Sequence, residues 1–189
     1  MQHRWLRILM ALVLLGAAAC FPPYVACTEG DTSCDFYTRE DVERLFGVSV
    51  SGPTMKATSL PAGKIWRYTF PCKGGTCALT LRLSSTSDIA KEGIFESARD
   101  QMDRQKRTRM SHEHASKSFR PIAGLGDDAF WSGQNLWILK GDTLIIITIQ
   151  SAVEGAFSTR EAADKAQAEQ DLSLSQKVAV TVLSRLSSD

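Results

Sequence analysis

The first half of the chain contains two stretches whose side chains alternate between two faces. Residues 64–70 and 77–84 both have the period of two that is typical of a β-strand with one buried face. Residues 73–76, which include two glycines, lie between them and predict a four-residue hairpin turn. The predicted inward-facing side chains are Trp66, Tyr68, Phe70, Leu79, Leu81 and Leu83.

The second half predicts three more short strands, at residues 128–131, 135–140 and 143–150. The pair Gly141-Asp142 separates the last two strands and suits a tight hairpin turn. Residues 144–149 (LIIITI) are apolar on both faces, which is typical of a central strand that is covered from both sides.

Three segments predict helices. Residues 38–47 begin with a capping-box pattern and end at a glycine. A second helix is expected from a cap at Ser87 to about Gln105, and a third over residues 172–186 with its cap at Ser173. The polar, basic stretch after the second helix predicts no element. Hairpins with helices before, between and after them predict a single α+β domain, in which helices pack on an antiparallel sheet as a two- or three-layer sandwich.

The N-terminus, residues 1–19, predicts a secretory signal peptide. A basic start precedes the unbroken apolar run 8–15, small residues follow it, and no acidic residue occurs. The apolar stretch is shorter than the ~20 residues that a membrane-spanning helix needs. The basic start consists of His3, Arg4 and Arg7.

Cys20 gives this junction the form of a bacterial lipobox, in which the cysteine is acylated and becomes the first mature residue. The chain has five cysteines, and acylation of Cys20 leaves an even number for disulfide pairing. Residues 17–19 also fit ordinary signal cleavage, so plain secretion is the alternative. Phe21 follows Cys20 in place of the Asp that signals inner-membrane retention, which favours the outer membrane if the host has one.

Removal of residues 1–19 leaves about 170 residues, the usual size of one domain. Residues 20–33 are proline-rich and then polar, and predict a tether to a domain at residues 34–189. Loss of Arg4 and Arg7 takes the formal net charge from +1 to −1. Net charge therefore gives no argument for nucleic-acid binding.

The four remaining cysteines are Cys27, Cys34, Cys72 and Cys77, and they can pair in three ways. The hairpin favours Cys72–Cys77, because the facing ends of a short turn can reach the Cβ separation of about 3.8 Å that a disulfide needs. Cys27–Cys34 is then the second bridge. The alternative joins Cys34 to Cys72 or Cys77. Neither spacing is the Cys-x-x-Cys of redox enzymes, so we expect structural disulfides.

Two stretches resemble a family of small bacterial cell-envelope lipoproteins of unknown function. Residues 34–47 are similar to its opening, in which a cysteine precedes a "T-x-x-[ED]-V…G" helix. Residues 124–131 (GLGDDAFW), followed by a hairpin with a "K-G-D" turn, are similar to its second half. The resemblance implies a PsbP-like α+β sandwich on a lipid anchor, and it brings no catalytic residues.

His112 and His114 form the one metal-like pair. They could chelate a metal from an extended segment, with Glu113 adding an oxygen ligand, although nearby basic side chains would oppose a cation and favour a solvated loop. The same basic side chains could instead lie against anionic headgroups or cell-wall polymer. They are Arg104, Lys106, Arg107, Arg109 and Lys117.

A second candidate site is aromatic. Its side chains could line a ligand cleft, and core packing beneath a helix is the alternative. They are Trp66, Tyr68, Trp131 and Trp137.

The sequence patterns that resemble enzyme motifs lack the surroundings that those motifs need. The degenerate dinucleotide pattern at residues 124–129 leads into a strand rather than a helix, and the few histidines supply no Ser-His-acid set. We therefore expect a non-enzymatic, lipid-anchored cell-envelope protein, without a cofactor, that binds an envelope protein or a small ligand. The alternative is a periplasmic protein that binds a metal or small ligand through His112 and His114 or through the aromatic face.

Overall fold

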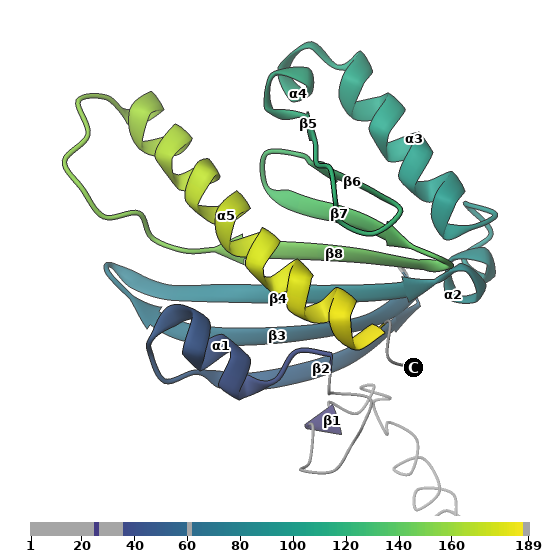
Figure 1. The fold of residues 1–189 in the computed structure, drawn as a ribbon, viewed down its shortest axis with the longest axis horizontal. Coiled ribbons are helices and arrows are strands. Elements are labelled where there is room, and N and C mark those ends of the chain that lie inside the picture. Colours follow the sequence, from purple (N-terminus) through teal and green to yellow (C-terminus); the bar gives the residue numbers. More distant parts are fainter. Residues whose placement is uncertain (1–24, 27–35, 60–61, 187–189) are drawn as a thin grey trace, which may run out of the picture.

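The computed structural model describes residues 25–26, 36–59 and 62–186. One antiparallel sheet of eight strands forms its centre, in the order β1-β2-β3-β4-β8-β7-β6-β5 (Figure 1). The strands are β1 (Val25–Ala26), β2 (Ser51–Ser59), β3 (Ala62–Cys72), β4 (Gly75–Ser85), β5 (Arg120–Pro121), β6 (Asp128–Trp131), β7 (Asn135–Lys140) and β8 (Thr143–Gln150). The predicted α+β class with helices on an antiparallel sheet is confirmed.

Five helices are described: α1 (Arg39–Phe46), α2 (Thr86–Lys91), α3 (Ala98–Ser111), α4 (Glu113–Ser118) and α5 (Arg160–Leu186). Among the described residues, no helix is both long and apolar enough to cross a membrane. The predicted signal peptide, Cys20, Cys27 and Cys34 lie outside the described residues. Within the predicted tether, two residues form β1 and pair with β2.

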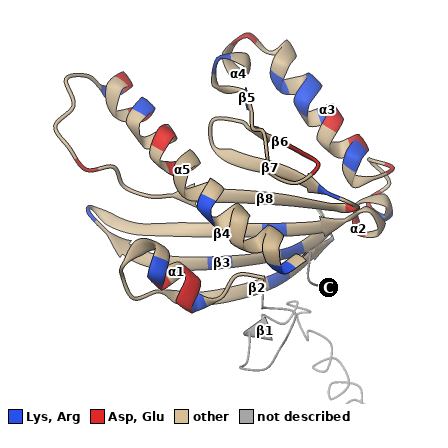
Figure 2. Cartoon of the chain, viewed as in Figure 1, with Lys and Arg blue, Asp and Glu red and all other residues tan. Residues whose placement is uncertain are grey.

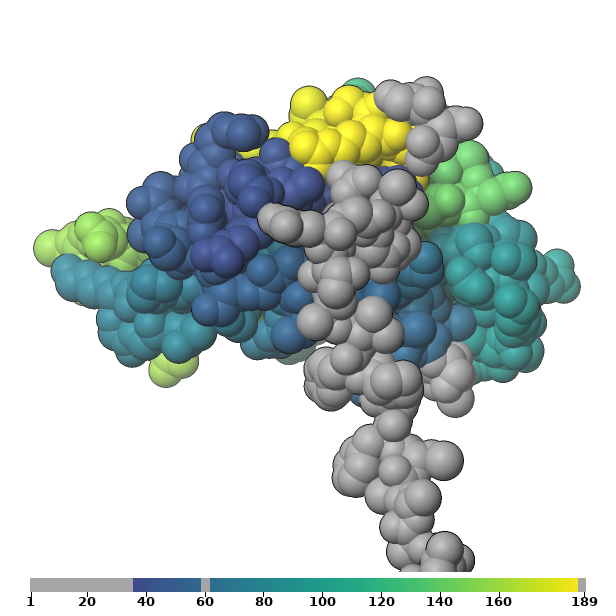
Figure 3. Space-filling view, turned by 90° about the horizontal axis from the view of Figure 1, so that it is seen from below, coloured from purple at the N-terminus to yellow at the C-terminus, as the bar shows by residue number. Residues whose placement is uncertain are grey.

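Helices α1 and α5 cover one face of the sheet (Figures 1 and 3). The inward side chains of β3 and β4 pack there in the larger hydrophobic core, together with Val178 and Val182 of α5. The alternation predicted for both strands is confirmed, because Trp66, Tyr68 and Leu79 are almost completely buried. This face carries most of the apolar burial that stabilises the domain.

The other face has a second, smaller core that covers only half of the sheet. Ala98 and Met102 of α3 pack there against Trp137, Leu144 and Ile146 of β7 and β8. Strand β8 thus has a core on each face, as the LIIITI pattern predicted. The half of this face formed by β2, β3 and β4 contributes no residue to the smaller core.

The three strands predicted in the second half of the chain have the predicted bounds. The turn between β3 and β4 is shorter than predicted: Cys72 lies directly opposite Gly75, so the turn consists of Lys73 and Gly74. Gly74 has a φ of 88°, which side chains disfavour and which makes so tight a turn possible. The predicted four-residue turn therefore begins at the correct residue but extends two residues too far, because Gly75 and Thr76 already belong to β4.

The single helix predicted from Ser87 to about Gln105 is also wrong, because the chain forms α2 and α3 with a break between them. Ser85 rather than Ser87 caps α2, through a reciprocal capping box with Asp88. Gly93 follows α2 with a φ of 70°, and Ser97 starts α3 by accepting a hydrogen bond from the Asp100 amide at 3.1 Å. Local capping chemistry outweighs the continuous helical pattern. The basic stretch expected to be irregular continues α3 and forms α4.

Helix α5 begins well before its predicted start, and Ser173 lies inside it rather than at its cap. Its N-terminal half is held by polar contacts to the segment after β8. Asp171 Oδ1 accepts a hydrogen bond from Ser151 Oγ at 2.6 Å, and Gln167 Oε1 accepts one from the Val153 amide at 2.8 Å. These tertiary contacts have no apolar period, so the sequence pattern did not indicate this half of the helix.

Helix α1 depends on Asp41, which is only 8% exposed to solvent. Its carboxylate completes the predicted capping box by accepting a hydrogen bond from the Thr38 amide, and it pairs with Arg185 of α5 at 2.6 Å. Burial alone would raise the pKa of Asp41, but the hydrogen bonds from Arg185 and Thr38 outweigh burial and lower this pKa. Asp41 thus joins the N-terminus of α1 to the C-terminal turn of α5.

We expect Asp41→Asn to lower the free energy of unfolding at pH 7 by about 2 kcal/mol, because hydrogen bonds to a charged partner are lost. The folded-state pKa of Asp41 lies below its unfolded value. Its contribution is therefore present above the unfolded pKa of about 3.9 and is lost as pH falls through the folded pKa. Urea unfolding from pH 7 to about pH 3 should show a smaller loss in the variant than in the wild type. Glu40→Gln, an exposed change on the same helix, is the control, and equal effects of the two changes would contradict this role.

Cys72 and Cys77 form a disulfide with a Cα–Cα distance of 5.7 Å, so the favoured pairing is confirmed. The bridge closes the tip of the β3–β4 hairpin. Replacing both residues by alanine should lower the free energy of unfolding by about 2 kcal/mol, since a short closed loop restricts the unfolded chain. Urea unfolding without reductant measures the change. A loss below about 0.5 kcal/mol would show that the bridge adds little to the hairpin.

Candidate binding surface

The aromatic side chains considered as ligand contacts lie in the hydrophobic core. Trp66, Tyr68 and Trp131 belong to the core beneath α1 and α5, and each is at most 2% exposed. Trp137 lies in the core on the opposite face, where its ring stacks on Phe130 with centroids 5.7 Å apart. The sheet separates the two groups, and they do not line a common cleft.

The two histidines considered as metal ligands are exposed where α3 meets α4. His112 stands between the helices and makes no side-chain capping hydrogen bond, and His114 lies in the first turn of α4. Within the part of the chain that the structure describes, no group of three His, Cys, Asp or Glu side chains is placed to hold a metal ion. Any metal site here would rest on this pair and Glu113.

A polar groove of about 390 Å³ lies between the ends of β7 and β8 and the N-terminal half of α5. Several of its polar atoms bind each other: Gln167 Nε2 donates to Asp171 Oδ1 at 3.0 Å, and Thr148 Oγ1 donates to Asn135 Oδ1 at 2.6 Å. The first contact lies within α5 and the second joins β7 to β8, while Gln167 Nε2 also donates to Ser151 Oγ, directly after β8, at 3.0 Å. The groove therefore offers few unpaired groups to a ligand.

The part of the sheet that the helices leave uncovered has a different character. We call it the open sheet face and define it by the outward residues of β2, β3 and β4. The strand register places Lys56 beside Ile65, and Arg67 between Thr54 and Thr80. Because alternate residues of a strand share a face, these side chains point away from the core that holds Trp66 and Tyr68. The open sheet face consists of Thr54, Lys56, Thr58, Ile65, Arg67, Thr69, Thr80 and Arg82, whereas Ala78 and Ser84 of β4 share this side but are buried.

The open sheet face carries positive charge without compensating acids. No acidic residue occurs from residue 44 to residue 87, a range that contains all of β2, β3 and β4. Figure 2 shows basic residues on these three strands and no acidic ones. Lys56 and Arg67 are exposed, and among the described residues neither side chain has an ion-pair or hydrogen-bond partner.

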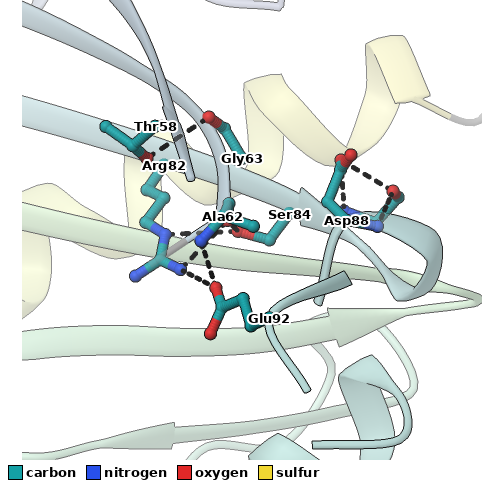
Figure 4. A network of polar contacts seen from close by, with 8 residues as sticks. Thr58, Ala62, Gly63, Arg82, Ser84, Asp88 and Glu92 are labelled. Carbon is teal, nitrogen blue, oxygen red and sulfur yellow. Dashed lines mark hydrogen bonds and ion pairs between the residues drawn. The ribbon is translucent and has the colours of Figure 1, made fainter. Parts of the chain in front are cut away.

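Arg82, the third cation of this face, is held in place by its neighbours (Figure 4). Its guanidinium donates to the Ala62 carbonyl at 3.1 Å and to Ser84 Oγ at 3.2 Å, and lies 3.9 Å from the Glu92 carboxylate. Glu92 also accepts a hydrogen bond from the Ala62 amide. Burial lowers the pKa of Arg82, and the charge of Glu92 opposes this shift. Arg82 is thus neutralised by a local partner, which leaves Lys56 and Arg67 as the free charges.

The arrangement suits an anionic surface better than a small molecule. Lys56 and Arg67 stand at diagonal positions on neighbouring strands. Residues at such positions are roughly 7–8 Å apart, so their long side chains lie within reach of each other. An extended face of cations and hydroxyl groups can donate hydrogen bonds to phosphate or carboxylate oxygens. We expected ligand contacts only on the buried face of β3 and not on the opposite face, although the absence of acids between Glu43 and Asp88 was a visible signal.

Comparisons with protein-family models, with curated proteins and with solved structures found no match to this chain. The lipoprotein resemblance therefore stays an expectation.

Proposed function

We propose that the protein is a lipid-anchored cell-envelope protein whose domain is a non-catalytic interaction module for an anionic partner. The lipid would be attached at Cys20, where the signal-peptide and lipobox patterns meet. The observation that carries the binding role is the pair of exposed, uncompensated cations Lys56 and Arg67 on the open sheet face.

Two further observations support this proposal over the alternatives. The aromatic side chains that could have lined a ligand cleft are buried, and the polar groove uses many of its groups internally. The uncovered half of the sheet, in contrast, is open to a large partner. Its charge has the sign that attracts phosphate, sulfate or carboxylate groups.

The anchor is tested by the mass of the protein extracted from the membrane fraction. We expect the mass of a chain that begins at Cys20 and carries acyl chains. Cys20→Ser should release the protein into the soluble fraction, because the acyl chains supply the membrane affinity. An unacylated wild-type protein found in the soluble fraction would contradict the anchor and favour plain secretion.

The binding surface is tested with fluorescent dextran sulfate as an anionic probe, followed by fluorescence anisotropy. Lys56→Glu/Arg67→Glu should weaken binding about tenfold or more, because two attractive charges become repulsive. The matched control is Arg107→Glu/Lys117→Glu, which reverses two exposed charges on α3 and α4. Equal losses in both variants would show that net charge alone decides binding, and would overturn the assignment to the open sheet face.

A further inference from the structure

The short strand β1 limits how far the domain can lie from its proposed anchor. Val25 of β1 pairs with Met55 of β2 at the edge of the sheet. Five peptide steps separate Cys20 from Val25, and a chain of that length spans at most about 17 Å when fully extended. A lipid on Cys20 would therefore keep the β2 edge of the sheet close to the bilayer. This edge faces the viewer in Figure 3.

The free cations of the open sheet face lie on this side of the molecule. Lys56 directly follows Met55, the residue of β2 that pairs with Val25 of β1, and Arg67 lies on the next strand, β3. The basic helix α3 packs against β7 and β8, several strands further along the sheet. Since neighbouring strands are about 4.8 Å apart, α3 lies on the order of 20 Å further from the β2 edge.

The charges also determine which face turns to the membrane. On the covered face, α1 beside β2 carries three acids, but Arg39 pairs with Glu43, and both Arg44 and Arg185 pair with Asp41, so this side has little net charge to attract an anionic bilayer. On the open sheet face, β2 and β3 carry Lys56 and Arg67 and no acid. The two faces of the same edge therefore differ, because the open sheet face attracts an anionic surface whereas the covered face is close to neutral.

We infer that the anionic partner of the open sheet face is the phospholipid surface to which Cys20 attaches the chain. This inference rests on the proposed function and names its partner. Lys56 and Arg67 contact headgroup phosphates, the threonine hydroxyls add hydrogen bonds, and α1 and α5 face away from the bilayer. Acyl anchoring alone leaves the domain free to rotate, whereas this second contact gives it one orientation.

The test is amine footprinting of the acylated mature protein in vesicles of phosphatidylcholine, with and without phosphatidylglycerol. A membrane-impermeant acetylating reagent labels exposed lysines, and mass spectrometry gives the rate at each site. On the anionic vesicles Lys56 should react at about one fifth of its rate on neutral vesicles, or more slowly still. Each basic residue near an anionic surface shifts the binding equilibrium by roughly this factor. Lys117 on α4 and Lys177 on α5, both exposed, should react at equal rates on the two kinds of vesicle.

Two single variants show whether the protection depends on this face. Arg67→Glu should abolish the protection of Lys56 on anionic vesicles, whereas Arg107→Glu on α3 should leave it intact. High salt should remove the protection in the wild type, because headgroup attraction is screened.

Equal labelling of Lys56 on both vesicles would overturn membrane docking. If dextran sulfate binding still depends on Lys56 and Arg67, the proposed interaction function survives with a partner other than the bilayer. Protection of Lys117 in place of Lys56 would also overturn the inference and assign the contact to α3 and α4. An intact mass without acyl chains would remove the anchor itself, and membrane docking through the open sheet face would fall with it.

Discussion

The burial of β8 on both faces is the constraint on which the rest of the structure depends. Ile145 and Ile147 pack in the core beneath α5, while Leu144 and Ile146 pack in the core beneath α3. Burial of each such side chain contributes roughly 1.5–3 kcal/mol, so both faces of this strand must be covered. Because β8 lies between β4 and β7, covering it places a helix on each side of the sheet centre.

The same constraint explains why the second face is only half covered. The smaller core ends at β8, and the neighbouring strand β4 presents Thr80 and Arg82 on that face. A helix packed further along, over β2 and β3, would bury the charges of Lys56 and Arg67 without partners, which is costly. The contact between Arg82 and Glu92 lies at the boundary between the smaller core and the open sheet face. There Glu92 neutralises the cation of the open sheet face that lies closest to the helices. Beyond it the sheet remains open and polar.

An open, cationic sheet face close to the proposed lipid anchor would link the architecture to the proposed function. The helices α1 and α5 stabilise the domain from one side and leave the β2–β4 surface available on the other. The anchor at Cys20 and the charges of Lys56 and Arg67 would act together, since a short tether raises the local concentration of the face near the membrane. The orientation of the domain would then follow from two weak contacts, the lipid anchor and the cationic face, rather than from one strong binding site.

The sequence alone determined the elements whose signals are local. Strand alternation at Trp66 and Tyr68, the apolar run of β8, and the capping box at Thr38 each depend on neighbouring residues, and all three were predicted correctly. Pairing of Cys72 with Cys77 followed from the hairpin between them.

Only the tertiary structure decided the features that depend on residues far apart in the chain. The N-terminal half of α5 is fixed by contacts such as that of Asp171 with Ser151, which leave no periodic pattern. The charge on β2 and β3 was visible in the sequence, but its gathering on an uncovered face was not, because coverage depends on where α3 packs. Local periodicity fixes which side of a strand is apolar, whereas long-range packing decides which polar side remains open to a partner.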